Sequence, residues 1–257
     1  MAARPTRALL QCIRESLQDR SPAARLAVFL TNAIRSFLET FVKHANYPRK
    51  IPTQARSRMM VETILASTAQ VLVKQGYAGT NTNLVAQRAG VSVGSVYQYF
   101  PNKDSLIAAL HERHAQATNR VILEVARQGE LTSLPAHLRV LVRALLQLHQ
   151  QEPELHRLLA SDFASLNCKA VESLSKARIA LSIQYLLERW RPMLVHGNLP
   201  LAAWLTAQVI TSMLKAYILD CPQISQAQIE DAISSSLTGL LCAHPDVHLA
   251  HSHSSAA

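Results

Sequence analysis

The stretch that decides the fold reads N-T-N-L-V-A-Q-R-A-G-V-S-V-G-S-V-Y-Q-Y-F and occupies residues 81–100. It predicts two short helices joined by a tight turn. We expect Thr82 to cap the first helix, which continues to Ala89, and Ser92 to cap the second. Gly90 lies between them, where a residue without a Cβ atom tolerates a positive φ angle. This spacing is typical of a helix-turn-helix.

The second of these helices, about residues 92–99, carries hydroxyl and amide side chains and no carboxylate. Such groups donate and accept hydrogen bonds with base edges and phosphates, whereas DNA would repel a carboxylate. Gly94 permits close approach of a backbone. Lys103 follows at the start of the next helix, close to the same face. The segment therefore predicts a surface that enters a DNA groove.

The pattern A-x-x-A-G-V-S-x-G-x-V-Y-x-Y-F-x-x-K-x-x-L holds without a gap from Ala86 to Leu106. In this pattern the chain resembles the TetR family of transcriptional regulators, over roughly residues 54–115. In that family the second helix lies in the major groove. The resemblance implies that Thr82, Tyr99 and Lys103 contact the DNA backbone. It places five further side chains at or near base edges or phosphates, with Gly94 permitting the approach: Ser92, Val93, Ser95, Tyr97 and Gln98.

Composition indicates an all-α protein of the reducing, cytoplasmic compartment. Of the 257 residues, 49% are hydrophobic, and only 7 are Gly and 11 Pro. The four cysteines form no C-x-x-C pair, which excludes a disulfide scaffold and the usual zinc spacings. The first residues lack the compact basic start and uncharged apolar stretch of a signal peptide, so we do not expect secretion.

The net charge of +9 lies in the first 117 residues. Residues 1–55 carry nine Lys/Arg against three Asp/Glu, residues 56–117 carry six against three, and residues 118–257 carry eleven of each. This split predicts that the basic part binds double-stranded DNA. Residues 1–50 form a predicted basic helical extension with a linker, which a typical TetR-family member lacks. It either adds nonspecific DNA affinity or is an accessory segment, or its start codon is assigned too far upstream.

Three regions are expected after this extension. They are a helix-turn-helix DNA-binding domain at residues 51–117, a helical effector-binding and dimerisation domain at 118–245, and a disordered tail at 246–257. Hydrophobic periodicity predicts helices, beyond the two short ones, over 57–75, 103–127, 133 to a break at Pro153, 154–166, 168–190, 201–219 and 225–242.

The helix at residues 201–219 is the most apolar, with 14 apolar residues of 19 and Lys215 as its one charge. A transmembrane span and a subunit interface both fit this composition. Polar residues within the helix favour the interface, and so does the amphipathic helix that follows. The resemblance likewise implies a homodimer joined by four such helices, without membrane contact. Leu205 and Leu214 are expected in this seam.

The ligands are less determined. The resemblance implies a small-molecule effector pocket among the helices between residues 120 and 220, but no motif names the effector. We expect no cofactor and no metal; the histidines near the C-terminus fit either a metal site or, as we prefer, the disordered tail. Candidate pocket residues, none of which is assigned, are His149, His156, Asp162, Cys168, Tyr185 and Trp190.

The sequence therefore predicts a dimeric regulator, most often a repressor in this family, that releases a near-palindromic operator when an effector binds. Two other classes remain open: an architectural DNA-binding protein without effector, and an all-α enzyme. The chain contains no H-E-x-x-H, no G-x-S-x-G and no P-loop, which disfavours the enzyme. The large neutral C-terminal part disfavours the architectural protein, which has no need of it.

Overall fold

The computed structural model describes residues 54–162, 169–195, 197–220 and 223–242. The chain divides into two units, Met1–Tyr47 and Pro48–Ala257, and the second holds every described residue. The predicted N-terminal extension and the predicted tail lie outside the described residues. Within the described part the regular elements are helices, without a strand, and an isolated antiparallel bridge joins Leu194 to Cys242. The predicted all-α fold is confirmed.

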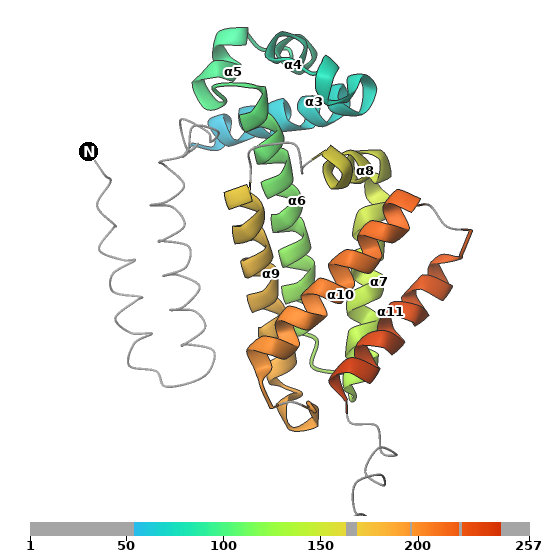
Figure 1. Cartoon of the computed structure of the whole chain (residues 1–257). Helices are drawn as coiled ribbons and strands as arrows, with labels where there is room; N and C mark the ends of the chain where they lie inside the picture. Colours follow the sequence, from blue (N-terminus) through green and yellow to red (C-terminus); the bar gives the residue numbers. More distant parts are fainter. Residues whose placement is uncertain (1–53, 163–168, 196, 221–222, 243–257) are drawn as a thin grey trace, which may run out of the picture. The chain divides into compact units, whose positions relative to one another are not determined.

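Three helices form the first group. They are α3 (Ala55–Gly79), α4 (Thr82–Ala89) and α5 (Val93–Tyr99). The predicted end of the first helix near residue 75 corresponds to a kink at Gly76, whose φ of 64° is a conformation that favours glycine. Helix α4 contacts both α3 and α5, so the two short helices are held on one long one (Figure 1).

The cap of α4 differs from the sequence prediction. Asn81, not Thr82, is the N-cap residue, because its side chain accepts a hydrogen bond from the backbone N–H of Leu84 at 2.9 Å. Asparagine caps at least as well as threonine, and it stands one residue earlier in the same N-T pair. Thr82 becomes the first helical residue and is nearly buried.

Helix α6 (Lys103–Ala126) connects the first group to the rest of the chain. Its start is a capping box, in which the Asn102 side chain accepts from the N–H of Ser105 and the Ser105 hydroxyl faces the Asn102 backbone. The helix packs against α3 at one end and runs beside α9 (Lys169–Glu188) along its length (Figure 1). One continuous helix thus spans from the helix-turn-helix into the C-terminal helices.

The remaining helices form the C-terminal group. Ser133 caps α7 (Leu134–Gln151), as predicted, and the predicted break falls at Glu152 and Pro153, where α8 (Pro153–Asp162) begins one residue earlier than expected. A short 3-10 turn, η2 (Arg191–Met193), follows α9 and precedes the last two helices, α10 (Leu199–Asp220) and α11 (Gln226–Leu241). Helix α10 contacts α8, α9 and α11, and α11 packs on α7. Leucine and isoleucine side chains of these helices make one continuous core.

Helix α10 is, among the described residues, long and apolar enough to cross a membrane. One face of the helix lies in the protein core: Ala203, Thr206, Ile210 and Leu214 are all less than 5% exposed. A helix that packs one face into a protein core can have this composition, so the composition alone does not indicate a membrane span. Leu214, which the sequence analysis expected in a subunit seam, is buried within its own chain.

Candidate nucleic-acid interface

The two short helices are fixed by a small apolar core. Helices α4 and α5 contact each other. Val85 and Ala86 on α4, Val96 on α5 and Phe100 after it are each at most 1% exposed. Gly90 makes the turn with φ 66° and ψ 30°, the left-handed conformation predicted for it. These contacts confirm the helix-turn-helix and hold α5 in one orientation on α4.

Ser92 fixes the start of α5. Its hydroxyl accepts from the N–H of Ser95 at 3.0 Å and lies 2.8 Å from the Ser95 hydroxyl, so the predicted cap is confirmed. The first-turn N–H groups and two hydroxyls therefore lie together at the exposed end of α5. Hydroxyls and helix N-terminal N–H groups are common phosphate contacts in protein–DNA complexes.

Five neighbouring residues of α5 and its cap leave their side chains or backbone at exposed positions, and Ser95 beside them is half-buried. Tyr97 is 42% exposed and Val93 37%. The set carries neither a carboxylate nor a cation, so any contact with bases would come from hydroxyl, amide and methyl groups. We call this set the reading face: Ser92, Val93, Gly94, Ser95, Tyr97 and Gln98.

Two of the predicted DNA contacts are buried. Thr82 is 9% exposed, and its hydroxyl lies 3.1 Å from the Tyr97 hydroxyl. Tyr99 is 6% exposed and packs into the protein. In this arrangement Thr82 orients Tyr97 across the two helices, and Tyr99 belongs to the core rather than to the reading face.

Lys103, at the start of α6, contacts a residue that sequence reasoning did not single out as functional, Tyr77. Its ammonium group donates to the Tyr77 carbonyl at 3.1 Å and lies 4.1 Å from the centre of the Tyr77 ring. The Tyr77 hydroxyl in turn donates to Asp104 at 2.6 Å. The kink at Gly76 brings Tyr77 to this place, a long-range consequence that no local pattern shows.

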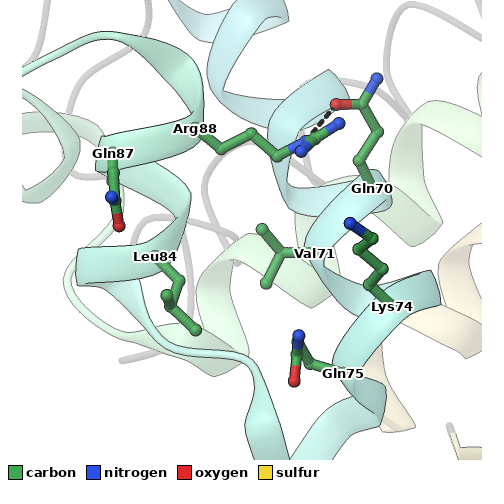
Figure 2. Close-up of a pocket in the computed structure, with 7 residues that line it drawn as sticks. All are labelled: Gln70, Val71, Lys74, Gln75, Leu84, Gln87 and Arg88. Carbon is green, nitrogen blue, oxygen red and sulfur yellow. Dashed lines mark hydrogen bonds between the residues drawn. The ribbon is translucent and has the colours of Figure 1, made fainter.

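A shallow hollow of about 530 Å³ opens between α3 and α4 (Figure 2). Its charged lining residues are Lys74 and Arg88, and Arg88 donates to Gln70 on α3. Val71 and Leu84 supply apolar walls. The hollow therefore adds positive charge beside the helix-turn-helix, and it does not lie among the C-terminal helices where the effector pocket is expected.

The residues that the sequence analysis named as candidates for an effector pocket lie in different surroundings from one another. Trp190 is buried and donates to His137 Nδ1 at 2.9 Å, while His137 Nε2 lies 2.9 Å from the Val125 carbonyl oxygen. His149 and His156 lie against each other and His114. Tyr185 is half-buried, and Cys168 and the Asp162 side chain lie outside the description. In the described part no three His, Cys, Asp or Glu residues are grouped so as to hold a metal ion.

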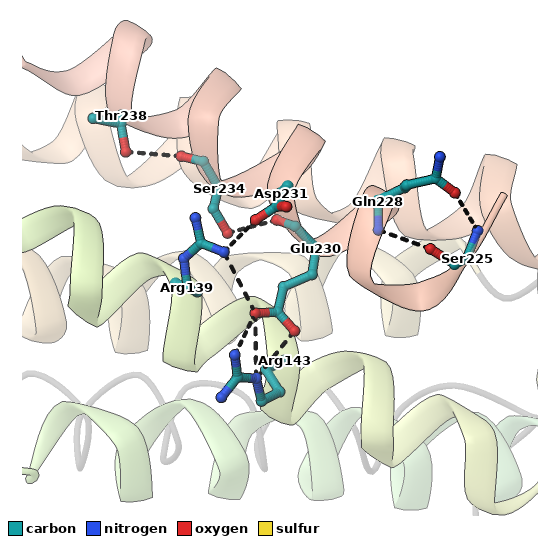
Figure 3. A network of polar contacts seen from close by, with 8 residues as sticks. All are labelled: Arg139, Arg143, Ser225, Gln228, Glu230, Asp231, Ser234 and Thr238. Carbon is teal, nitrogen blue, oxygen red and sulfur yellow. Dashed lines mark hydrogen bonds and ion pairs between the residues drawn. The ribbon is translucent and has the colours of Figure 1, made fainter.

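An ionic network joins α11 to α7 (Figure 3). Arg143 donates two hydrogen bonds to the nearly buried carboxylate of Glu230, from Nη2 to Oε1 at 2.7 Å and from Nε to Oε2 at 3.0 Å. Arg139 pairs with Asp231, and its Nη1 lies 3.9 Å from Glu230. This fork-shaped pairing fixes the rotation of α11 on α7.

The outer side of α10 is apolar at one end. Trp204 is 53% exposed and Leu201 41%, whereas Leu205 is half-buried. An exposed tryptophan beside an exposed leucine is typical of a contact surface rather than of a solvated helix. The sequence prediction of a seam in this region therefore moves from Leu214 to Trp204 and Leu201.

Fold and site together define a helix-turn-helix DNA-binding protein with a helical C-terminal domain. Residues 64–110 match the family described as "Bacterial regulatory proteins, tetR family". Residues 133–244 match the family described as "Tetracyclin repressor-like, C-terminal domain". The two matches together cover more than half of the chain and follow one another in the expected order. The chain belongs to the TetR family of transcriptional regulators, as the sequence pattern predicts.

Individual relatives agree with this assignment. The chain is 37% identical to the HTH-type transcriptional regulator YvkB of Bacillus subtilis over 68 residues, which are 26% of this chain and only 35% of YvkB. It is 29% identical to the HTH-type transcriptional repressor Rv3405c of Mycobacterium tuberculosis over 153 residues, 57% of this chain and 80% of that protein. The fold of the Stenotrophomonas maltophilia SmeT–triclosan complex matches with a TM-score of 0.61 at 17% identity, covering 73% of this chain and 93% of SmeT.

Proposed function

We propose that the protein is a sequence-specific DNA-binding repressor of the cytoplasm, without catalytic activity. The observation that carries the proposal is the reading face, which is exposed, free of carboxylates and held on a helix-turn-helix with a fully buried core. Polar side chains on a rigid helix are what direct reading of the major groove requires. Lys103 and the basic residues around the hollow supply phosphate contacts.

The protein binds DNA as a homodimer in this proposal. Trp204 and Leu201 on α10 form the apolar part of the seam, and α11 is held beside it by the Arg143–Glu230 pair. Two-fold symmetry places two reading faces on one duplex, so the operator is near-palindromic. The half-sites are then about one helical turn, or ~10 bp, or somewhat more apart.

An effector regulates the binding in this proposal. SmeT, which shares the fold, has been crystallised with triclosan, and Rv3405c is named a repressor. Helix α6 offers the physical route, since it begins with Lys103 beside the reading face and packs along α7 and α9 in the C-terminal domain. A small molecule that shifts α6 would change the separation of the two reading faces and release the operator.

Selection from a random-sequence duplex library tests this proposal. The full chain is incubated with the library at about 0.15 M salt, and bound duplexes are amplified and sequenced over several rounds. We expect enrichment of one motif with two inverted half-sites. Binding without any enriched motif would contradict it and favour an architectural DNA-binding protein, since phosphate contacts alone carry no sequence information.

A further inference from the structure

Three imidazole rings from three different helices lie against one another in the C-terminal domain. They are His114 on α6, His149 on α7 and His156 on α8, which we call the histidine cluster. Ring centres are 5.0 Å apart for His114 and His149, 4.4 Å for His114 and His156, and 4.8 Å for His149 and His156. The DNA-reading and dimerisation roles leave these residues unexplained.

Two of the three rings make a hydrogen bond from Nδ1 to a backbone carbonyl. His149 Nδ1 lies 2.7 Å from the Leu145 carbonyl oxygen, and His156 Nδ1 lies 2.8 Å from the His149 carbonyl oxygen. Because a carbonyl only accepts, both Nδ1 atoms carry the hydrogen and donate it. Each neutral ring then keeps an unprotonated Nε2, and a second proton would charge the ring inside the cluster.

Burial works against that second proton. Desolvation lowers the pKa of His149 from about 6.5 to about 4, and it also lowers the pKa of His156. Desolvation, reinforced by the neighbouring His156 and His149 rings, lowers the pKa of His114 well below its ordinary value. Two charged imidazoles at these ring separations would also repel each other strongly.

Few charges around the cluster could compensate. On α6, His111 and Arg113 disfavour a charge on His114, and the Glu152 carboxylate favours one on His156. Glu152 is itself 3.8 Å from Arg113. The other described charged groups of these helices have partners outside the cluster or are exposed to solvent. Lys103 and Asp104 bond to Tyr77, Glu112 pairs with Arg178, Glu188 with Arg191, Arg139 and Arg143 with Glu230 and Asp231, and Arg157 with Glu154. Solvent-exposed positions carry Arg56, Arg58, Glu62, Lys74, Arg120, Glu124, Lys176, Lys215 and Asp220.

The location of the cluster gives it a consequence. Helix α8 contributes His156, and the same helix contacts α3, the long helix of the DNA-binding group, and α10, the helix of the proposed seam. Helix α6 contributes His114 and begins at Lys103 beside the reading face. A change that separates α8 from α6 and α7 would therefore loosen the support of α3.

We propose that the histidine cluster is a proton-sensitive joint: in acid, charging of these rings drives α8 away from α6 and α7 and thereby weakens DNA binding. The effect on DNA rests on the proposed function, whereas the loosening of α8 does not. The ligand of this site is the proton. At neutral pH the rings are uncharged and α8 is packed (seated) against α6 and α7.

The direction of the effect follows from linkage. A histidine whose pKa is lower when α8 is seated than when it is released binds more protons in the released state. The seating free energy is therefore complete above pH 6.5 and falls as the pH drops toward 4. For His149 alone, these two values make release about 30-fold more favourable at pH 5.0 than at pH 7.5.

Hydrogen exchange of the full chain at pH 7.5 and pH 5.0 tests the joint. We expect the protection factors of α8 to fall about 30-fold in acid relative to those of α11, which carries no histidine. The double variant His149→Asn/His156→Asn cannot be protonated at these two positions, which removes two of the three charges that acid would add, and each asparagine side-chain nitrogen can still donate to the carbonyl that Nδ1 reaches. This variant should keep the protection of α8 at pH 5.0. The matched control, His251→Asn/His253→Asn near the C-terminus, should lose it like the wild type.

Unchanged α8 protection in acid would overturn the proposal, and so would an equal loss in the asparagine variant. If the double variant does not fold, a ring titration of the wild type by nuclear magnetic resonance replaces it, and titration of His114 near pH 6.5 would overturn the joint. Binding to a random-sequence duplex at low salt is measured alongside. Loss of α8 protection with unchanged DNA affinity would overturn the link to α3, and absence of DNA binding at every pH would instead contradict the proposed function.

Discussion

The helix-turn-helix and the C-terminal domain differ in how far along the chain their polar contacts reach. Both cap helices locally, through Asn81, Ser92 and Asn102 in the first and Ser133 and Ser225 in the second. In the first, contacts between helices span 15 residues for Thr82 with Tyr97 and 26 for Lys103 with Tyr77. In the second, they span 87 residues for Arg143 with Glu230 and 53 for Trp190 with His137. Contacts of that range make the positions of helices distant in the sequence depend on one another. Regulation is therefore expected in the C-terminal domain.

The largest effect should come from charges placed on the two sides of α10. Leu214→Glu would bury an unpaired carboxylate in the core and cost several kcal/mol, so the protein should not fold. Trp204→Glu places the same charge on the exposed side and should give a folded monomer. Circular dichroism and light scattering distinguish these results. A folded dimer of the Trp204 variant would place the seam elsewhere.

The long-range network should be the next most sensitive. Trp190→Phe removes the N–H that donates to the buried His137 Nδ1, and leaving this acceptor unpaired should cost about 1–3 kcal/mol. Denaturant unfolding followed by circular dichroism measures the loss. The exposed Trp204→Phe is the matched control and should change the free energy of unfolding little. Equal stabilities of the two variants would show that the His137 contact is not a structural link.

A substitution at Gly94 in the reading face should leave the fold intact and yet weaken DNA binding. A methyl group on Gly94 would meet only the Ser92 hydroxyl, at 3.7 Å, so Gly94→Ala should fold and gain up to about 1 kcal/mol of helix stability. The same methyl group should weaken DNA binding if the backbone approaches DNA closely there. Thermal unfolding and duplex binding are measured on one preparation. Full retention of affinity would remove Gly94 from the contact surface.

The smallest effect expected is that of a single phosphate contact. Lys103→Ala should weaken binding to selected and random duplexes alike and lower the slope of log affinity against log salt by about one. Its stability is checked in parallel, because the ammonium group also binds the Tyr77 carbonyl. Lys176→Ala, at an exposed position of α9, serves as the control cation. Equal slopes for wild type and the Lys103 variant would exclude a backbone contact.

The same contrast explains how much the sequence could predict. The turn at Gly90, the cap at Ser92 and the break at Pro153 are local, and each is confirmed. Asn81 was missed because two capping residues stand side by side and only the backbone decides between them. The histidine cluster and the Tyr77–Lys103 contact depend on how helices pack, and periodicity does not specify which side chains meet across them. Leu214 shows the same limit, since an apolar stripe does not say whether a neighbouring helix or a partner chain covers it.

In the proposed function the reading face, and not the phosphate contacts, determines which sequence is bound. Gln98 carries the one long amide of that face and can pair bidentately with adenine, which would favour it by about 1–3 kcal/mol over a wrong base.

Binding-site selection run in parallel on the wild type, Gln98→Ala, Ser95→Ala and Lys103→Ala measures this claim most directly. We expect a relaxed or shifted motif for the Gln98 and Ser95 variants, with nearly unchanged affinity for random duplexes. For the Lys103 variant we expect an unchanged motif with weaker binding throughout. Identical motifs from all four proteins would show that the reading face does not select the sequence and would place sequence recognition outside α5.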